Sequence, residues 1–479
     1  MEVILEQMLA AREARSMRQF TLNRTYGLPI ISFSMNIPGP IKDSPLIRRG
    51  FLAGCAMLDH RLPRRAVKLR EVHPAVTGWE ATYVLDMDAG KVKEITTAID
   101  DGLPQGRLFD MDVLGTDLMK LDRELVGGKS RDCIVCGAPG RGCASRRIHS
   151  VPELQKAAND ILTRHFAQTD AQQIGIWAVQ SLLDEVCTTP KPGLVDRRNN
   201  GSHKDMDLFT FFASASALAP YFLRCAQIGQ ETANDTPEAT FQRLRMAGLS
   251  AEQDMYAATG GVNTHKGAIF TIGLLCGAAG RLWRPEGGWE AGALLEEVAA
   301  MTAQVVYKDF GSGSADTAGQ RLYAQNGIRG IRGEAAQGLP SVGRLGLPIY
   351  RELKDQGLTC ERAGAITLLH LIGRVEDTNM LSRGGLDGAK EGKNRVLALL
   401  AANARPSEEQ IEALDDWFIQ RNLSPGGCAD MLAAIYFVDR LSAGRPSLWE
   451  GGAQPPRGNF MNLDQSARTT SRPSAKPET

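Results

Sequence analysis

The chain has 479 residues, which is too long for one core of ordinary size and predicts two or three domains. Hydrophobic residues make up 43% and charged residues 23% of the chain, so it has enough apolar surface to build real cores. The 55 basic and 55 acidic side chains give a formal net charge of zero. This balance argues against a nucleic-acid binder and means that any phosphate site must be local.

The first 165 residues predict an α+β domain. Short apolar runs at 28–35 and 82–87 are separated by turn-forming prolines and glycines, a pattern typical of strands between loops. Residues 1–18 mix charged and apolar side chains at helical spacing, and they lack the uninterrupted apolar core of a signal peptide. We therefore expect a cytoplasmic protein.

Two aspartates mark a candidate metal site in this domain. In the segment LFDMDVL, residues 108–114, an extended backbone would turn Asp110 and Asp112 to the same side. Two carboxylates on one face suit the chelation of a divalent ion such as Mg²⁺ at a phosphoryl-transfer site. Polar alternation on a solvated strand would give the same letters, so both interpretations stay open.

The cysteines predict reduced thiols for the most part. There are nine of them, and six are scattered singly, mostly in apolar helical contexts. The cluster Cys133-x2-Cys136-x6-Cys143, followed after five residues by His149, has the ligand types of a zinc site. The second half of the usual paired-knuckle spacing is missing, so reduced structural thiols are the favoured interpretation and Zn²⁺ is the alternative.

Residues 166–450 predict a larger all-α domain of the orthogonal-bundle type, with the boundary near 151–168. Apolar side chains recur at helical spacing in long segments, among them 208–226 and 428–441. The longest weakly polar run, 267–280, is shorter than the roughly 18 residues of a membrane span. It predicts a buried helix, and we expect no membrane contact.

Polar segments separate and follow these helices. Glycine totals 50 of the 479 residues, and the excess lies in the connections between helices, where the backbone could approach a ligand closely. Residues 451–479 are polar and contain prolines, which predicts a disordered tail.

The loop CTTPKPGLVDRRNNGSHKDMD, residues 187–207, carries the densest group of charged side chains. Lys191 and Arg197 offer partners for phosphate. Three carboxylates could hold Mg²⁺, namely Asp196, Asp205 and Asp207. A solvated interdomain loop is the alternative interpretation.

The segment TGGVNTHKGA, residues 259–268, opens an apolar helix. Gly260 and Gly261 with free amides at a helix N-terminus indicate an anion site, to which Lys266 adds a full charge. The lysine precedes its neighbouring glycine, which excludes a P-loop. His265 either belongs to an active site or makes a local hydrogen bond, and the sequence does not separate the two.

Two further motifs lie at predicted helix ends. In RVEDTN, Glu376 and Asp377 end an apolar helix, where carboxylates oppose the helix dipole unless a metal or Arg374 compensates them. In SPGGCAD, residues 424–430, we expect Ser424 to cap the next helix with proline at its first position, which favours a structural role.

Five of these stretches resemble the triphosphoribosyl-dephospho-CoA synthase family. They are LLDEVCTTPKPGLVDRRNNGSHKDMD, ATGGVNTHKGAIF, GIRGEA, VEDTN and SPGGCAD, in that order over about residues 170–442. The first 165 residues resemble the citrate lyase holo-acyl-carrier-protein synthase family through FSMNIPGPIK, GRLFDMDVL and the segment CxxCG…CASRRIHS. The chain therefore resembles a bifunctional fusion of the two.

The resemblance implies two consecutive reactions. The C-terminal domain would join ATP to dephospho-CoA, with a ribose hydroxyl attacking the anomeric carbon of ATP and adenine leaving. The N-terminal domain would transfer phosphoribosyl-dephospho-CoA to a serine of the citrate lyase acyl carrier protein, the gamma subunit, and release diphosphate. Each step would draw on Mg²⁺.

The resemblance also implies roles for individual residues. The residues expected to take part in catalysis are Asp196, His265, Glu376, Asp377, Asp110 and Asp112. The substrate-binding residues are Lys191, Arg197, His203, Gly260, Gly261, Thr264, Lys266, Asn379 and Ser424, together with Lys42, Arg146 and Arg147 of the first domain. The metal ligands are Asp110, Asp112, Asp205 and Asp207. Surface solvation is the alternative for Lys42 and the arginine pair.

Two other functions are alternatives to the bifunctional transferase. One is prosthetic-group synthesis for malonate decarboxylase, against which the FSMNIPGP segment speaks. The other is a non-catalytic chaperone of a carrier protein, against which the candidate acids and bases in both domains speak.

Overall fold

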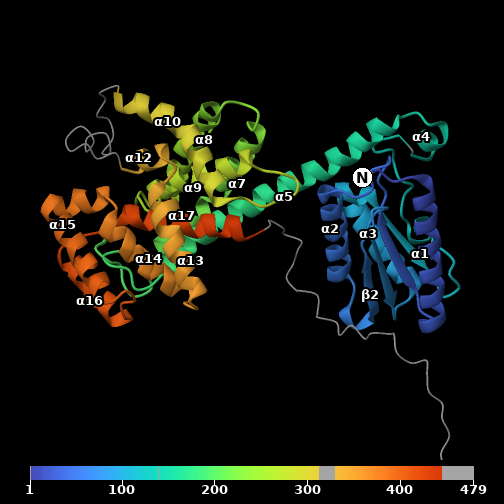
Figure 1. The fold of residues 1–479 in the computed structure, drawn as a ribbon, viewed down its shortest axis with the longest axis horizontal. Coiled ribbons are helices and arrows are strands. Elements are labelled where there is room, and N and C mark those ends of the chain that lie inside the picture. Colours follow the sequence, from blue (N-terminus) through green and yellow to red (C-terminus); the bar gives the residue numbers. More distant parts are fainter. Residues whose placement is uncertain (1, 139, 312–329, 445–479) are drawn as a thin grey trace, which may run out of the picture.

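The structure, a computed structural model, describes residues 2–138, 140–311 and 330–444. An N-terminal α+β domain and a larger helical domain lie side by side and are joined by one long helix, α5 (Figure 1). The predicted fold class and domain order are confirmed. The predicted disordered tail, 451–479, lies outside the described residues.

The N-terminal domain is built on a four-stranded antiparallel sheet in the order β2-β3-β1-β4. Its elements in chain order are α1 (Leu5–Tyr26), β1 (Ile30–Met35), α2 (Pro45–Arg61), η1 (Arg64–Ala66), β2 (Val67–His73), β3 (Glu80–Leu85), α3 (Ala89–Gly102), η2 (Pro104–Leu108), β4 (Phe109–Leu114), η3 (Arg123–Val126) and α4 (Gly140–Arg146). The predicted strands 28–35 and 82–87 correspond to β1 and β3. The predicted extended segment 108–114 corresponds to β4.

Strand alternation gives the sheet one apolar face and one largely polar face, the latter with a small apolar cluster at one end. On β1, Phe33 points into a core that contains Phe51 of α2, and the two rings stack with their centroids 5.0 Å apart. The neighbouring Ser32 faces the other side, where it lies opposite Asp112 of β4. Helix α1 runs over this second face, and its Arg15 and Arg18 both bind Glu80 of β3.

Helix α5 (Val151–Cys187) passes through the predicted boundary without a break. Ser150 caps its first turn in a capping box with Glu153. Its first half packs Leu162 and Phe166 against residues of the N-terminal domain, whereas its second half, from Ala171 onward, belongs to the core of the helical domain. The boundary is therefore a helix shared by two cores and not a loop.

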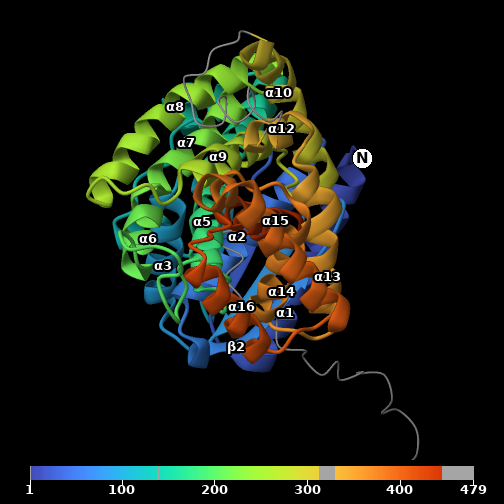
Figure 2. The same cartoon turned by 90° about the vertical axis from the view of Figure 1, so that its left-hand side faces the viewer.

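The helical domain continues after α5 with eleven further described helices and one π-helical turn. They are α6 (Leu208–Ala217), α7 (Ala219–Glu231), α8 (Pro237–Ala258), α9 (Lys266–Arg281), α10 (Ala291–Gly311), α12 (Gly330–Ala336), η4 (Ser341–Gly346), α13 (Leu347–Asp355), α14 (Cys360–Arg374), α15 (Thr378–Ala402), α16 (Glu408–Gln420) and α17 (Gly426–Ala443). Figure 2 shows α14, α15 and α16 on the side turned away from the sheet.

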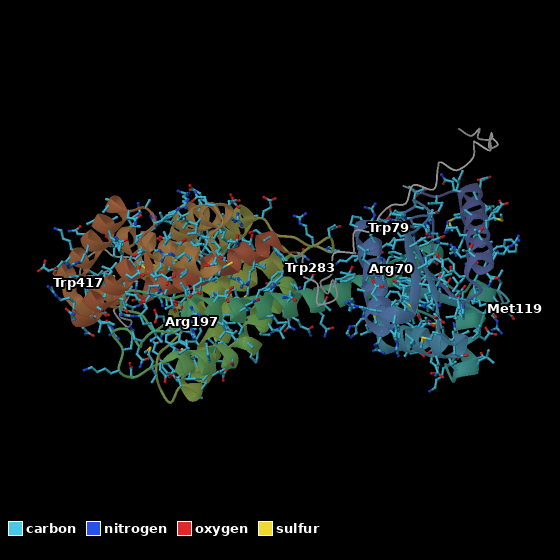
Figure 3. The ribbon with its side chains drawn as sticks, turned by 90° about the horizontal axis from the view of Figure 1, so that it is seen from below. Arg70, Trp79, Met119, Arg197, Trp283 and Trp417 are labelled. Atoms are coloured by element: carbon cyan, nitrogen blue, oxygen red, sulfur yellow. The ribbon has the colours of Figure 1, made fainter. Side chains whose placement is uncertain are left out.

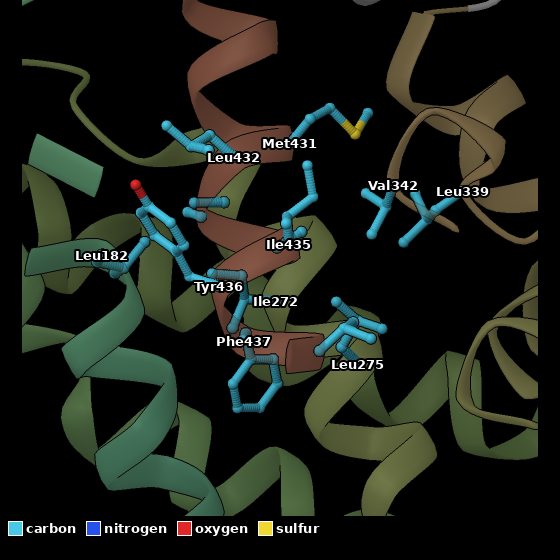
Figure 4. Packing of buried hydrophobic residues seen from close by; sticks show 14 of the residues in the cluster. Leu182, Ile272, Leu275, Leu339, Val342, Met431, Leu432, Ile435, Tyr436 and Phe437 are labelled. Carbon is cyan, nitrogen blue, oxygen red and sulfur yellow. The ribbon is translucent and has the colours of Figure 1, made fainter. Parts of the chain in front are cut away.

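Helix α17 lies at the centre of this domain. Figure 4 shows Ile435 and Tyr436 of α17 packed among Leu182 of α5 and Ile272 of α9, all of them nearly inaccessible to solvent. The predicted buried helix 267–280 is α9, which confirms that prediction.

One stretch, Leu208–Glu231, is long and apolar enough to cross a membrane by length and composition alone. It is divided between α6 and α7 at Leu218, and buried residues of α7 such as Phe222 and Cys225 belong to the main core. Packing within the protein accounts for the apolar side chains of α7, whereas Phe209 of α6 is exposed.

Asp170 of α5 fastens the two domains to each other. Its carboxylate accepts hydrogen bonds from Arg49 of α2, at 2.5 and 2.9 Å, and from Trp283 Nε1 at 2.7 Å. Asp170 is fully buried, and the Arg49 guanidinium also lies 4.1 Å from the centroid of the Phe166 ring. Figure 3 shows Trp283 at the junction of the two domains.

This junction yields a test of stability. Asp170→Ala leaves the Arg49 guanidinium buried without its carboxylate, so we expect the free energy of unfolding to fall by about 3–5 kcal/mol. Urea unfolding followed by tryptophan fluorescence measures the change. Asp43→Ala is the matched control, because it removes the solvent-facing ion pair with Arg48 and should change little. A loss no larger than that of the control would contradict the assignment.

Two candidate active sites

A cavity of about 710 Å³ opens in the helical domain. It lies among the end of α5, the loop that follows, and the N-terminal ends of α9, α15 and α17. Ten of the predicted site residues line it: Lys191, His203, Asp205, Thr264, His265, Lys266, Glu376, Asp377, Asn379 and Ser424. Motifs that are far apart in the sequence therefore meet at one place.

Lys191 forms a buried ion pair at the floor of this cavity. Its Nζ donates to Glu185 Oε1 at 2.5 Å and to the Glu185 carbonyl oxygen at 2.8 Å, and both side chains are almost completely buried. Burial raises the pKa of Glu185, and the Lys191 charge opposes that rise. Lys191 thus already carries a carboxylate partner, which reduces the positive charge that it can offer to a phosphate.

Asp377 is held by the N-termini of two helices. One carboxylate oxygen accepts hydrogen bonds from the amides of Asn379 and Met380 in the first turn of α15, and the other accepts from the Cys428 amide in α17. Burial nevertheless raises its pKa. The prediction that this carboxylate opposes a helix dipole was wrong, because Asp377 is the N-cap of the next helix.

Asp430 is a cavity residue that the sequence reading did not select. The Ala268 amide in the first turn of α9 faces this carboxylate and favours its charged form. Burial, followed by the charges of Glu185 and Asp377, raises its pKa well above the ordinary value. A Cβ on Gly267 would lie 1.9 Å from Asp430 Oδ2, so the close approach of the two helices requires glycine there.

His265 belongs to a chain of three polar side chains. Thr264 Oγ1 donates to Ser214 Oγ, and Ser214 Oγ lies 2.7 Å from His265 Nδ1. Among the described residues, Nδ1 is the acceptor available to the Ser214 hydroxyl proton, which favours the tautomer with the imidazole proton on Nε2. This buried Nε2 has no hydrogen-bond partner among the described residues. Burial and then the Lys191 charge lower the pKa of His265 to about 3.

Ser424 bonds to a histidine and does not cap a helix. Its Oγ lies 2.9 Å from His203 Nε2, and Arg383 Nη2 lies 3.1 Å from the other ring nitrogen. Burial and then the Arg383 charge lower the pKa of His203 to about 4. Helix α17 starts at Gly426 with Pro425 at the N-cap position, so the predicted cap was wrong.

Five predicted residues lie outside the lining of this cavity, namely Asp196, Arg197, Asp207, Gly260 and Gly261. Asp196 is buried and accepts hydrogen bonds from the amides of Lys191, Arg198 and Asn199, so it shapes the loop. Arg197 is exposed and pairs with Glu361, and Asp207 caps α6. The two glycines lie in an exposed turn with positive φ before α9.

Acidic side chains outnumber basic ones around the cavity. The acidic residues of the lining are Glu185, Asp205, Glu334, Glu376, Asp377 and Asp430. The basic residues are Lys191, Lys266, Arg374 and Arg383. Glu185, Glu334 and Asp430 lie inside the motifs LLDEVC, GIRGEA and SPGGCAD, so the motifs carried the signal although these residues were not selected.

A second cavity, of about 1030 Å³, lies in the N-terminal domain beside β4. Asp110 and Asp112 share the polar face of the sheet, as predicted, and both line this cavity. Lys120 Nζ lies 2.5 Å from Asp112 Oδ1. Burial, followed by the Asp112 charge, raises the pKa of Asp110. The pair therefore lies in a partly desolvated site where added positive charge would be stabilised.

Basic side chains surround the two aspartates. Lys42 and Arg147 line the cavity, whereas Arg146 does not. Lys42 Nζ donates to the Ile37 carbonyl oxygen, and burial followed by the Arg12 charge lowers its pKa. Five further basic residues of the lining were not selected from the sequence, namely Lys93, Arg107, Lys120, Arg123 and Arg131. Arg107 lies inside the motif GRLFDMDVL, whereas the other four lie outside the quoted motifs and are brought to the cavity by the fold.

The protonation state of His265 can be measured directly. Nitrogen-15 NMR should show a neutral ring with its proton on Nε2 near pH 7, because Ser214 donates to Nδ1. The folded-state pKa values of His265 and His203 lie below the ordinary 6.5, so protonation favours the unfolded chain. The contribution of these two neutral histidines to the free energy of unfolding should be fully present above pH 6.5. It should be lost as the pH falls toward 4 for His203 and toward 3 for His265. Exposed His60 supplies the reference signal, and titration of His265 near 6.5 would contradict the assignment.

Comparisons with known proteins match both domains. A family described as "ATP:dephospho-CoA triphosphoribosyl transferase" matches residues 171–447, and one described as "Apo-citrate lyase phosphoribosyl-dephospho-CoA transferase" matches residues 3–165. The N-terminal match ends and the C-terminal match begins within α5, at residues 165 and 171.

Similar proteins span the whole chain. "Protein CitXG" of Haemophilus influenzae is 34% identical over 452 residues, which cover 91% of this chain and 96% of that protein. "Protein CitXG" of Leuconostoc mesenteroides is 34% identical over 456 residues, which cover 91% of this chain and 97% of that protein. A "Probable 2-(5''-triphosphoribosyl)-3'-dephosphocoenzyme-A synthase" of Vibrio cholerae is 41% identical over 274 residues, covering 56% of this chain and 88% of that protein. The chain therefore belongs to the CitXG family of bifunctional transferases, in which a citrate lyase transferase domain precedes a triphosphoribosyl-dephospho-CoA synthase domain.

Proposed function

We propose that each of the two activities of this bifunctional enzyme resides in one of the two cavities. The helical cavity makes triphosphoribosyl-dephospho-CoA from ATP and dephospho-CoA, and the cavity beside β4 transfers the product to the citrate lyase acyl carrier protein. The observation that carries this assignment is that each matched domain holds one large cavity lined by carboxylates and basic side chains.

The charge of the helical cavity supports a requirement for Mg²⁺. A triphosphate is strongly anionic, and the acidic side chains of the lining outnumber the basic ones. Asp430 and Glu376 are the residues that we expect to hold the ion, with Asp205 at the exposed rim. Asp430 suits this role because the neighbouring charges that raise its pKa would also stabilise a cation. Bound there, Mg²⁺ would neutralise phosphate charge.

The carboxylates also fit the ribosyl transfer. The attacking ribose hydroxyl forms a bond to the anomeric carbon of ATP while the bond from that carbon to adenine breaks. Asp377 accepts the hydroxyl proton, which its raised pKa favours, and adenine leaves with a proton from solvent. Glu376, at the adjacent position, stabilises the positive charge that develops on the ribose. His265 Nε2–H provides a neutral hydrogen-bond donor to the substrate.

The second cavity fits a displacement at phosphorus. A serine hydroxyl of the carrier protein, the gamma subunit of citrate lyase, attacks the phosphorus nearest the ribose. The bond to the diphosphate breaks, and the serine proton passes to solvent. Asp110 and Asp112 would hold Mg²⁺, whose charge assists departure of diphosphate. Lys42 and Arg147 bind the phosphate groups.

The intermediate travels between two distant sites. Ser150 and Val151 at the start of α5 line one cavity, and Glu185 near its end lines the other. A helix rises 1.5 Å per residue, which separates these residues by roughly 50 Å. We infer that the intermediate leaves the first cavity into solvent before it reaches the second. The nine free cysteines suit a reducing compartment, and we propose that both steps occur in the cytoplasm.

Lys266 provides a test of ATP binding. It lines the cavity, half-exposed, and its Nζ lies 2.8 Å from Glu252 Oε2. Lys266→Ala removes a charge-assisted contact worth about 1.5–3 kcal/mol, so the ATP concentration for half-maximal adenine release should rise at least about tenfold. Dephospho-CoA saturation should change less.

Glu252→Gln is the matched control for this variant. If Lys266 serves ATP, releasing it from Glu252 should leave the ATP requirement unchanged or lower it. If the lysine serves only the ion pair, both variants should follow the wild-type ATP curve, and Lys266 is then not part of the site.

A second test separates the two activities. Asp110→Asn and Asp112→Asn remove metal-binding charge from the cavity beside β4, so carrier modification should fall at least about a hundredfold while adenine release stays normal. Intact-mass analysis of the carrier and an adenine assay measure the two steps. Asp86→Asn, at an exposed carboxylate paired with Lys68, is the control and should leave both unchanged. Near-normal transfer by both test variants would reduce the pair to solvated strand residues.

A further inference from the structure

Four possible metal ligands converge at the edge of the cavity beside β4. Their ligand atoms all lie within 4.8 Å of one another, and we call them the cysteine-histidine cluster: Cys133, Cys136, Cys143 and His149. Cys136 Sγ lies 3.5 Å from Cys143 Sγ and 3.3 Å from His149 Nε2. Tetrahedral zinc with bonds of about 2.3 Å to sulfur and about 2.0 Å to nitrogen places two sulfur atoms roughly 3.8 Å apart and sulfur and nitrogen roughly 3.5 Å apart, so both observed distances are within about 0.3 Å of the required ones.

The backbone around Cys133 is shaped to present two thiols together. The Cys133 amide donates to the Ala138 carbonyl oxygen at 2.7 Å, and the Gly137 amide donates to the Cys133 carbonyl oxygen at 3.0 Å. Gly137, directly after Cys136, has a φ of +71°, which favours glycine. This tight turn brings Cys133 and Cys136 to one side, as a metal-binding knuckle requires.

The surrounding segment has little apolar packing of its own. Within the described part of 127–150, Cys143 is the one buried residue, and Ile134 is the one side chain that packs against an apolar cluster. Ile148 is exposed, and Arg147 has a positive φ. A polypeptide segment with so small a core needs another source of order, and a bound metal supplies it in small domains.

We propose that the cysteine-histidine cluster binds one structural zinc ion that fixes a wall of the transferase cavity. Four protein ligands leave zinc no open position, which is typical of structural and not catalytic sites. Arg147 lies between two of the ligands in sequence, and Arg131 precedes the first by two residues; both line the cavity. The ion thereby acts as a positioning element for these arginines.

The favoured sequence interpretation, reduced thiols without metal, considered spacing alone. A second Cys-x2-Cys pair is not needed to complete the four ligands. Cys143 comes from α4, and His149 comes from the turn between α4 and α5. The effect of zinc on carrier modification rests on the proposed transferase function. The zinc content of the chain does not, so it tests the metal site by itself.

The test is metal analysis of the full chain, purified with reduced thiols and without chelators. We expect about one zinc per chain. Cys136→Ser and Cys143→Ser should each lose most of it, whereas Cys360→Ser, at an exposed cysteine of the helical domain, should keep it. The two zinc-poor variants should modify the carrier at least about tenfold more slowly with adenine release unchanged, and trypsin should cleave 127–150 faster.

Cobalt substitution of the wild-type chain tests the site without any variant, so its result does not depend on whether the cysteine variants fold. Bound cobalt should give thiolate-to-metal charge-transfer absorption that is lost when zinc is added back. A wild-type chain that contains no zinc and takes up neither metal would overturn the proposal. Zinc retained in both Cys136→Ser and Cys143→Ser would overturn it as well, because the ion would then lie elsewhere.

Discussion

The architecture depends on a single helix that must satisfy two cores at once. Helix α5 gives Leu162 and Phe166 to the N-terminal domain and Ile174 and Leu182 to the helical domain. Between these sets lies Asp170, a fully buried carboxylate whose charge is tolerated because Arg49 and Trp283 donate to it. A helix of 37 residues with apolar packing at both ends cannot bend freely, so it fixes the separation of the two cavities.

The candidate site of the helical domain is assembled around the ends of helices. In the helical domain, Asp377 binds the first turns of α15 and α17, and Asp430 faces the first turn of α9. Glycine allows the close approach of α9 to Asp430, because a Cβ on Gly267 would lie 1.9 Å from Asp430 Oδ2. The sheet domain instead presents Asp110 and Asp112 from one strand. Both solutions hold carboxylates in partly desolvated places, where a cation and an anionic substrate are bound more strongly than in water.

Much of the fold and of the two candidate sites could be predicted from the sequence, and the predictions that were wrong or incomplete have physical causes. Apolar periodicity predicted the all-α domain, and strand alternation placed Asp110 and Asp112 on one face. The prediction for Asp377 failed because two helices follow each other closely: α14 ends at Arg374, and Asp377 already caps α15. Glu185 lay inside a recognised motif but was not selected, whereas Lys93 was missed because only tertiary packing brings it to a cavity. The continuity of α5 was missed because a change of pattern marks a boundary between cores, which a helix can cross.

The central claim is that the two sites work independently on one rigid scaffold and exchange a free intermediate. Mixing two inactive chains tests it most directly, one carrying Asp377→Asn in the helical cavity and the other Asp112→Asn beside β4. With ATP, dephospho-CoA, Mg²⁺ and apo carrier protein, the account predicts that the mixture attaches the prosthetic group, as seen by intact mass, although neither variant does so alone. An unmodified carrier in the mixture, under conditions in which the wild-type chain modifies it fully, would contradict the account.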